Sequence, residues 1–153
     1  MGPLTIYYED MLVGKRFVSE PRTLKSTEID SFAKLTGDMN RLHVDEDYAK
    51  RTIFRGRIAH GLLILSMATG LWFDMNLTRD SVVALLAIKS VTFRAPVHPG
   101  DRFHLVSTVR SRRPSQSKPD AGIVTLHDVI EDENGNRILD FERVLLVNRA
   151  PKG

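Results

Sequence analysis

Cysteine is absent from the 153 residues of this chain. Its absence excludes disulfides and cysteine-ligated metal sites and fits a reducing compartment, so we expect a cytoplasmic protein. The opening residues, MGPLTIYYED, lack the basic region and apolar run of a signal peptide. The longest apolar stretch covers only residues 58–73. A bilayer span needs roughly 20 apolar residues, so we predict a buried helix there and no membrane segment.

Several motifs are missing as well. The chain has no H-E-x-x-H, P-loop, G-x-G-x-x-G or G-x-S-x-G sequence, which argues against metal, nucleotide and serine-nucleophile sites. His98, His104 and His127 have no metal-like spacing, and we assign them no role. A net charge of +3 is small for a dedicated nucleic-acid binder. The basic segments 50–57 and 110–118 are either solvated surface or contacts for an anion such as a phosphate-bearing ligand.

The residues that are present predict one α+β domain over 1–153, without repeats or linkers. Residues 16–24 predict a first strand, which Pro21 either interrupts or confines to an edge of the sheet. STEIDSFAKLTGD predicts a helix with Thr27 as N-cap, Asp30 at the capping-box position and Gly37 at its left-handed end. The next residues then form a loop, and DEDYAK one further helical turn.

The later residues predict a sheet around a central helix. Residues 58–73 are apolar on every side, and such a helix must be surrounded by other elements. About four antiparallel strands follow, the last two joined by a hairpin at ENGN, with a polar loop at 112–120 (RRPSQSKPD). This order of elements is an α+β roll.

TGDMNRLH, residues 36–43, gathers an acid, an amide and an imidazole on no regular repeat. In a strand Asp38 and Asn40 would share a face that His43 leaves, and helical neighbours are three or four positions apart. We therefore expect an irregular turn. Taken alone, Asp38 has an ordinary interpretation as turn chemistry and His43 as a structural histidine.

Two longer stretches, FAKLTGDMNRLHVDEDYAK and FRGRIAHGLLILSMATGL, resemble the MaoC-like dehydratases, the R-specific enoyl-CoA hydratases of the hotdog fold. That family has an aromatic residue, a spacer, Gly-Asp-x-Asn-Pro-aliphatic-His and a later Ala, and a His-Gly pair opens its central helix. Arg41 stands where the family has proline. The resemblance implies an antiparallel sheet wrapped around a long central buried helix. The matching positions are Phe32, Gly37, Asp38, Asn40, Leu42, His43, Ala49, His60 and Gly61.

The resemblance also implies a hydro-lyase of fatty acid metabolism. It would hydrate trans-2-enoyl thioesters or dehydrate 3-hydroxyacyl thioesters, with Asp38 and His43 activating one water. The backbone N–H of Gly61 would bind the thioester oxygen. Asn40 would orient the aspartate or a carbonyl, and Ser66 either supports Asp38 or bonds back to its own helix. No metal and no cofactor are implied, because coenzyme A is part of the substrate.

The expected partners follow from the same family. A lone hotdog domain leaves strand edges exposed, so a homodimer or higher homo-oligomer is expected, with the site at the subunit interface. Arg55 and Arg57 are candidate contacts for the phosphates of coenzyme A or of an acyl carrier protein's phosphopantetheine arm. His60 is expected to pack at the start of the helix rather than to catalyse.

Two alternative functions stay open. The first is a hotdog acyl-CoA thioesterase, which usually carries its acid on the central helix, whereas no acid lies between His60 and Phe73. The second is a non-catalytic hotdog subunit that binds acyl-CoA. The presence of both Asp38 and His43 argues against that reading.

Overall fold

An antiparallel sheet organises residues 4–153, which the computed structural model describes. The strand order is β1-β4-β5-β6-β3, and β2 also pairs with β4. The predicted α+β class is thereby confirmed. The strands are β1 (Arg16–Val18), β2 (Arg22–Thr23), β3 (Val82–Phe93), β4 (Arg102–Pro114), β5 (Ala121–Asp132) and β6 (Arg137–Asn148). The helices are η1 (Tyr8–Asp10), α1 (Ser26–Thr36), α2 (Arg41–Val44), α3 (Glu46–Lys50) and α4 (Gly61–Asp74).

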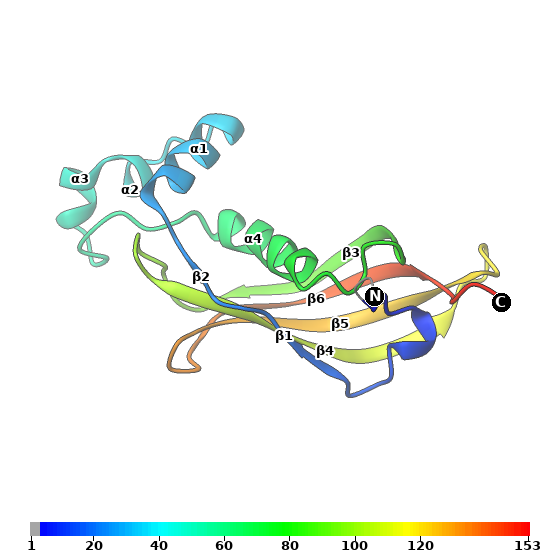
Figure 1. Cartoon of the computed structure of the whole chain (residues 1–153). Helices are drawn as coiled ribbons and strands as arrows, with labels where there is room; N and C mark the ends of the chain where they lie inside the picture. Colours follow the sequence, from blue (N-terminus) through cyan, green and yellow to red (C-terminus); the bar gives the residue numbers. More distant parts are fainter. Residues whose placement is uncertain (1–3) are drawn as a thin grey trace.

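The long helix α4 lies along one face of the sheet (Figure 1). The three shorter helices α1, α2 and α3 gather beyond the end of the sheet where α4 begins, and both chain ends lie toward the opposite end (Figure 1). The segment between β2 and α4 therefore lies at the amino end of α4.

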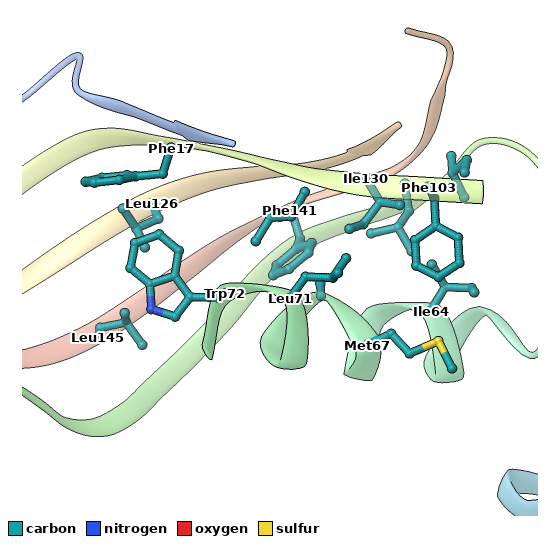
Figure 2. Close-up of a cluster of buried hydrophobic side chains, with 14 of the residues drawn as sticks. Phe17, Ile64, Met67, Leu71, Trp72, Phe103, Leu126, Ile130, Phe141 and Leu145 are labelled. Atoms are coloured by element: carbon teal, nitrogen blue, oxygen red, sulfur yellow. The ribbon is translucent and has the colours of Figure 1, made fainter. Parts of the chain in front are cut away.

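The hydrophobic core lies between α4 and the sheet (Figure 2). Trp72 makes an edge-to-face contact with Phe17, with ring centroids 5.2 Å apart, and donates its Nε1–H to Thr78 Oγ1 at 2.8 Å. Each fully buried large apolar side chain of this kind contributes about 1.5–3 kcal/mol. The buried residues of α4 are Leu63, Ile64, Met67, Ala68, Leu71 and Trp72, and they face sheet residues that include Phe103, Leu126, Ile130, Phe141 and Leu145.

The other side of α4 is open in a single chain. Leu62 and Phe73 are 60% and 56% exposed, and they share a stripe with Ser66 and Thr69 at helical spacing. The prediction of a helix surrounded on all sides is thus wrong for the isolated chain, because the sheet covers only one face of the helix. Within residues 4–153, no helix is both long and apolar enough to cross a membrane.

The two edges of the sheet differ strongly. Strands β1 and β2 are short and lie on either side of Pro21, which confirms the predicted interruption. Strand β3 is 12 residues long, has three register shifts and, among residues 4–153, pairs only with β6. Its apolar side chains are half exposed, namely Val83, Leu85, Leu86, Ile88 and Phe93. A long apolar edge is a pairing surface unless something covers it.

The structure confirms one of two predicted connections between strands and shortens the other. The hairpin between β5 and β6 is confirmed, and Gly135 supplies a φ of +80° in its turn. The polar loop expected at 112–120 is shorter, because β4 continues to Pro114 past a register shift between Val109 and Ser111. The sequence could not show this, since a bulge on one strand depends on the register of its partner.

Helix α1 ends as predicted but begins differently. Gly37 adopts a φ of +81° and its N–H donates to the Ala33 carbonyl, as expected for a left-handed helix end. The predicted cap at Thr27 with Asp30 is wrong. Lys25 is the N-cap, and its backbone N–H donates to the Glu28 carboxylate at 2.9 Å. The reciprocal acid therefore lies two positions earlier than predicted.

Candidate active site

Asp38 follows directly on the left-handed end of α1. Thr36 Oγ1 donates to the Phe32 carbonyl at 2.7 Å and accepts from the Asp38 N–H at 3.2 Å. Gly37 turns the chain between these two residues. The carboxylate of Asp38 is thus held at the surface on a short, tightly bonded turn.

The residues after Asp38 form the single-turn helix α2 rather than the irregular turn that we predicted. Asn40 is its N-cap, and Asn40 Oδ1 accepts the Leu42 N–H at 3.0 Å. The backbone N–H of Asn40 donates to Asp38 Oδ1 at 3.3 Å. Asn40 therefore contacts the aspartate through its backbone, and its side-chain oxygen starts the helix that carries His43.

The imidazole of His43 is fixed by the segment that precedes α4. Its Nδ1 lies 2.8 Å from the carbonyl oxygen of Ile58. A carbonyl can only accept, so Nδ1 carries the proton of this hydrogen bond. In that tautomer Nε2 keeps a free lone pair that can accept a proton.

Asp38, His43 and His60 come together at this point. One ligand atom from each side chain lies within 4.8 Å of those of the other two. Two hydrogen bonds of about 2.8 Å that meet at one water span roughly 4.5 Å, so a single water fits between the carboxylate and an imidazole. The same three groups also have the donor types that bind a divalent transition metal.

The amino end of α4 lies beside this cluster. The N–H groups of Leu63 and Ile64 donate to the His60 carbonyl, whereas the Gly61 N–H has no hydrogen-bond partner among residues 4–153. An unpaired N–H at a helix start combines a donor with the positive end of the helix dipole. A Cβ at Gly61 would lie 2.6 Å from the Phe93 ring, so only glycine fits here without a shift.

A mainly apolar cavity of about 650 Å³ opens at the same place. His43 and Gly61 both line it, so the imidazole and the helix start border one space. Our sequence reasoning missed the apolar walls, because they come from separate elements that only folding brings together. His98 supports one wall by hydrogen bonding the Phe54 carbonyl at 2.7 Å. The walls include Phe54, Ile58, Leu62, Phe93, Val97, Ile138 and Leu139.

Comparison with known proteins decides the family. The profile of the MaoC like domain matches residues 11–129. The chain belongs to the MaoC-like dehydratase family. It is 34% identical over 110 residues to a protein named (R)-specific enoyl-CoA hydratase from Rhodospirillum rubrum, covering 72% of this chain and 74% of that relative. Across the first curated relatives, the chain spans from 32% to 74% of the relative's own length.

Solved structures agree on the fold. The monoamine oxidase regulatory protein from Archaeoglobus fulgius is 33% identical, with a TM-score of 0.88 and 99% of each chain covered. A Mycobacterium tuberculosis protein described as a double hotdog fold is 24% identical, with a TM-score of 0.85, covering 97% of this chain and 46% of that one. This MaoC-like chain therefore has the hotdog fold that its sequence motif implied.

In this MaoC-like protein the remaining candidate residues lie apart from the cluster. Ser66 Oγ donates to the Leu62 carbonyl at 2.8 Å, which is the second of the two interpretations that we gave it. Arg57 is only 12% exposed, and its guanidinium pairs with Asp30 at 2.6 Å and with Glu46 at 3.7 Å. Its charge is thus already matched within the chain, so the proposed phosphate contact does not fit Arg57.

Arg55 and Arg41 differ in their surroundings: Arg55 is exposed, whereas Arg41 forms an ion pair. Arg55 is exposed on the loop before α4 and has a φ of +59°. Arg41, which replaces the family's proline, pairs with Asp45 at 2.9 Å and lies over the Tyr48 ring. The Tyr48 N–H, and after it Arg41, lower the pKa of the Asp45 carboxyl. The charge of Arg41 is therefore matched by Asp45, at the start of α3.

Proposed function

We propose that this protein adds water to trans-2-enoyl thioesters with R specificity and catalyses the reverse dehydration of 3-hydroxyacyl thioesters. One observation carries the proposal: His43 and Gly61, whose N–H is free, line one apolar cavity, and the Asp38 carboxylate lies within 4.8 Å of His43. The relative named (R)-specific enoyl-CoA hydratase supports the same chemistry.

In the proposed reaction Asp38, His43 and the Gly61 N–H each have a separate role. The Asp38 carboxylate and His43 Nε2 hold one water against the double bond, and the water oxygen bonds to C3. His43 Nε2 accepts a proton from that water as the C3–O bond forms, while the Asp38 carboxylate accepts a hydrogen bond from the other O–H. The same proton then passes from Nε2 to C2, so H and OH join the same face and both groups return to their starting states. The negative charge that develops on the thioester oxygen meets the Gly61 N–H. One such donor lowers a barrier by roughly 3 kcal/mol.

Crotonyl-CoA tests this proposal. We expect its enoyl absorbance to fall on incubation with the protein, with (R)-3-hydroxybutyryl-CoA as product and no free thiol. Because we propose that no metal takes part, a chelator should leave the rate unchanged. Release of free thiol would instead indicate the thioesterase, and no reaction in either assay would indicate the non-catalytic acyl-CoA-binding subunit.

We further propose that the protein acts as a homodimer that pairs through β3. This strand is the long edge of the sheet and its apolar side chains are half exposed, while the opposite edge is short and interrupted by Pro21. A second copy would also cover the open stripe of α4 that contains Leu62 and Phe73. A twofold contact of this kind uses the same surface on both copies.

Leu85→Asp is expected to dissociate this dimer. Leu85 is 49% exposed in the isolated chain. Because the change occurs twice in a twofold contact, it removes about 2 kcal/mol of apolar burial and adds two buried carboxylates. We expect the dimer Kd to rise roughly 100-fold or more, measured by light scattering across a concentration series.

The matched control for that variant is Leu12→Asp. Leu12 is 56% exposed and lies between η1 and β1, away from β3. The control should leave the dimer intact. A monomeric wild type, or a Leu85→Asp protein that stays dimeric, would contradict the proposed pairing.

We propose that the acyl thioester is carried by coenzyme A or an acyl carrier protein and that Arg55 meets its phosphates. Arg55→Glu should raise the KM for crotonyl-CoA roughly tenfold with little change in kcat, since each 1.4 kcal/mol is a factor of ten. Arg16→Glu is the control, because Arg16 is exposed on β1, at the edge of the sheet opposite β3, and belongs to neither basic segment. An unchanged KM in the Arg55 variant would exclude the contact.

A further inference from the structure

His60 is the most deeply buried of the three clustered side chains. It is 2% exposed and is the N-cap residue of α4, directly before Gly61. Its ring stacks on the His43 ring, with centroids 3.9 Å apart and planes 28° from parallel. It also packs against the Phe32 ring, with ring centroids 4.9 Å apart. His60 therefore touches both the helix before Asp38 and the imidazole after it.

A hydrogen bond joins His60 to the backbone of Asp38. His60 Nε2 lies 2.9 Å from the Asp38 carbonyl oxygen. Since the carbonyl only accepts, Nε2 carries the proton and donates it. The second ring nitrogen, Nδ1, is buried and has no partner among residues 4–153. The only hydrogen bond that this ring makes within that part of the chain is thus the one to Asp38.

The short segment Ile58–Gly61 contacts every part of the proposed catalytic apparatus. The Ile58 carbonyl accepts from His43 Nδ1, and His60 donates to the Asp38 carbonyl. Gly61 follows with its free N–H. The segment itself is fixed by the bond from the Ala59 N–H to the Val97 carbonyl, 2.8 Å long. One stretch of extended chain therefore sets the positions of the acid, the base and the oxyanion donor relative to one another.

We infer that His60 is a positioning residue that holds Asp38 at the distance from His43 at which one water fits between them. This inference rests on the proposed function. The hydrogen bond fixes the Asp38 main chain, and the stacked ring keeps His43 in the same place. His60 neither accepts nor delivers a proton in the reaction, because its Nε2 keeps its proton and donates it in the hydrogen bond to the Asp38 carbonyl.

Two variants separate the hydrogen bond from the packing. His60→Phe keeps an aromatic ring against His43 and Phe32 but has no donor. His60→Gln places an amide N–H near the position of Nε2 but loses the ring. Small misplacements of reacting groups cost about 100-fold in rate, so His60→Phe should lower kcat about 100-fold with KM within threefold. His60→Gln should recover at least tenfold of that loss.

Each outcome has a distinct meaning. A wild type that does not hydrate crotonyl-CoA overturns the proposed function. An active wild type with a His60→Phe variant of similar kcat overturns only the positioning role, since packing alone would then matter. Equal loss in both variants overturns it as well, since the donor that glutamine supplies would then restore nothing. Ring ¹⁵N spectra of the unaltered protein test the geometry without any substitution. They should show the proton on Nε2 of His60 and on Nδ1 of His43, and the opposite tautomer of His60 would overturn the inference.

Discussion

Asp38→Asn and His43→Gln are each expected to lower kcat for crotonyl-CoA hydration by about 10²–10⁴-fold, the range that a positioned acid or base contributes. KM should change little, because both substitutions leave the apolar walls of the cavity unaltered. The double variant should be no more than about tenfold slower than the slower single variant. Both groups act on the same water. When residues act as a unit, removing one already abolishes most of their joint contribution, so removing the second costs little more.

Steady-state kinetics on the four proteins of this cycle check the prediction. Asp47→Asn is the control, since this carboxylate is exposed on α3 close in sequence but outside the cluster. It should keep a kcat within twofold of the wild type. If the fold-loss in kcat of the double variant equals the product of the two single losses, Asp38 and His43 act independently. That result would contradict the proposal that they share one water.

Features that depend on neighbouring residues could be predicted from the sequence. The left-handed end of α1 at Gly37, the hairpin around Gly135 and the apolar helix α4 all follow from local patterns. The family motif added the hotdog fold, because its conserved spacing reports on contacts that a single chain does not reveal.

Features that depend on distant residues could not be predicted in the same way. Arg57 is a plain cation in the sequence, but folding pairs it with Asp30, 27 positions away. His60 looked like a packing residue at the start of a helix, yet its ring reaches back 22 positions to Asp38. A signal was available for His60: it directly precedes Gly61, the glycine that we propose as the oxyanion donor, so a side chain at position 60 lies next to the proposed site.

The sidedness of α4 was missed for a related reason. Its sequence is apolar all round, which is typical of a helix that is buried on every side. The sheet buries one side, and the other side would be buried by a second protein chain. Leu62 and Phe73 on the helix and Leu85 on β3 are all exposed in one copy. In the proposed dimer, this apolar pattern would report on the subunit contact as well as on the fold of one chain.

Asp128→Asn is expected to cause the largest loss of stability. Asp128 on β5 and Arg143 on β6 are 0% and 3% exposed, and Arg143 Nε lies 2.6 Å from Asp128 Oδ2. Ser107 Oγ also donates to the carboxylate, and Arg143 lies over the Trp72 ring at 4.6 Å. Removing the charge of one partner leaves a buried guanidinium uncompensated. Such a change costs about 3–5 kcal/mol, which corresponds to a fall in Tm of roughly 10 °C.

The double variant Asp128→Leu/Arg143→Met separates two explanations of that loss. If the pair is needed only because each charge neutralises the other, apolar side chains of similar volume should restore the free energy of unfolding to within about 1 kcal/mol of the wild type or above it. Urea unfolding of both variants measures this. A double variant as unstable as Asp128→Asn would show instead that the bonds to Ser107 and Trp72 hold the three strands to α4. In that case the ion pair stabilises the sheet against which α4 packs, and so also the position of Gly61 at the start of α4.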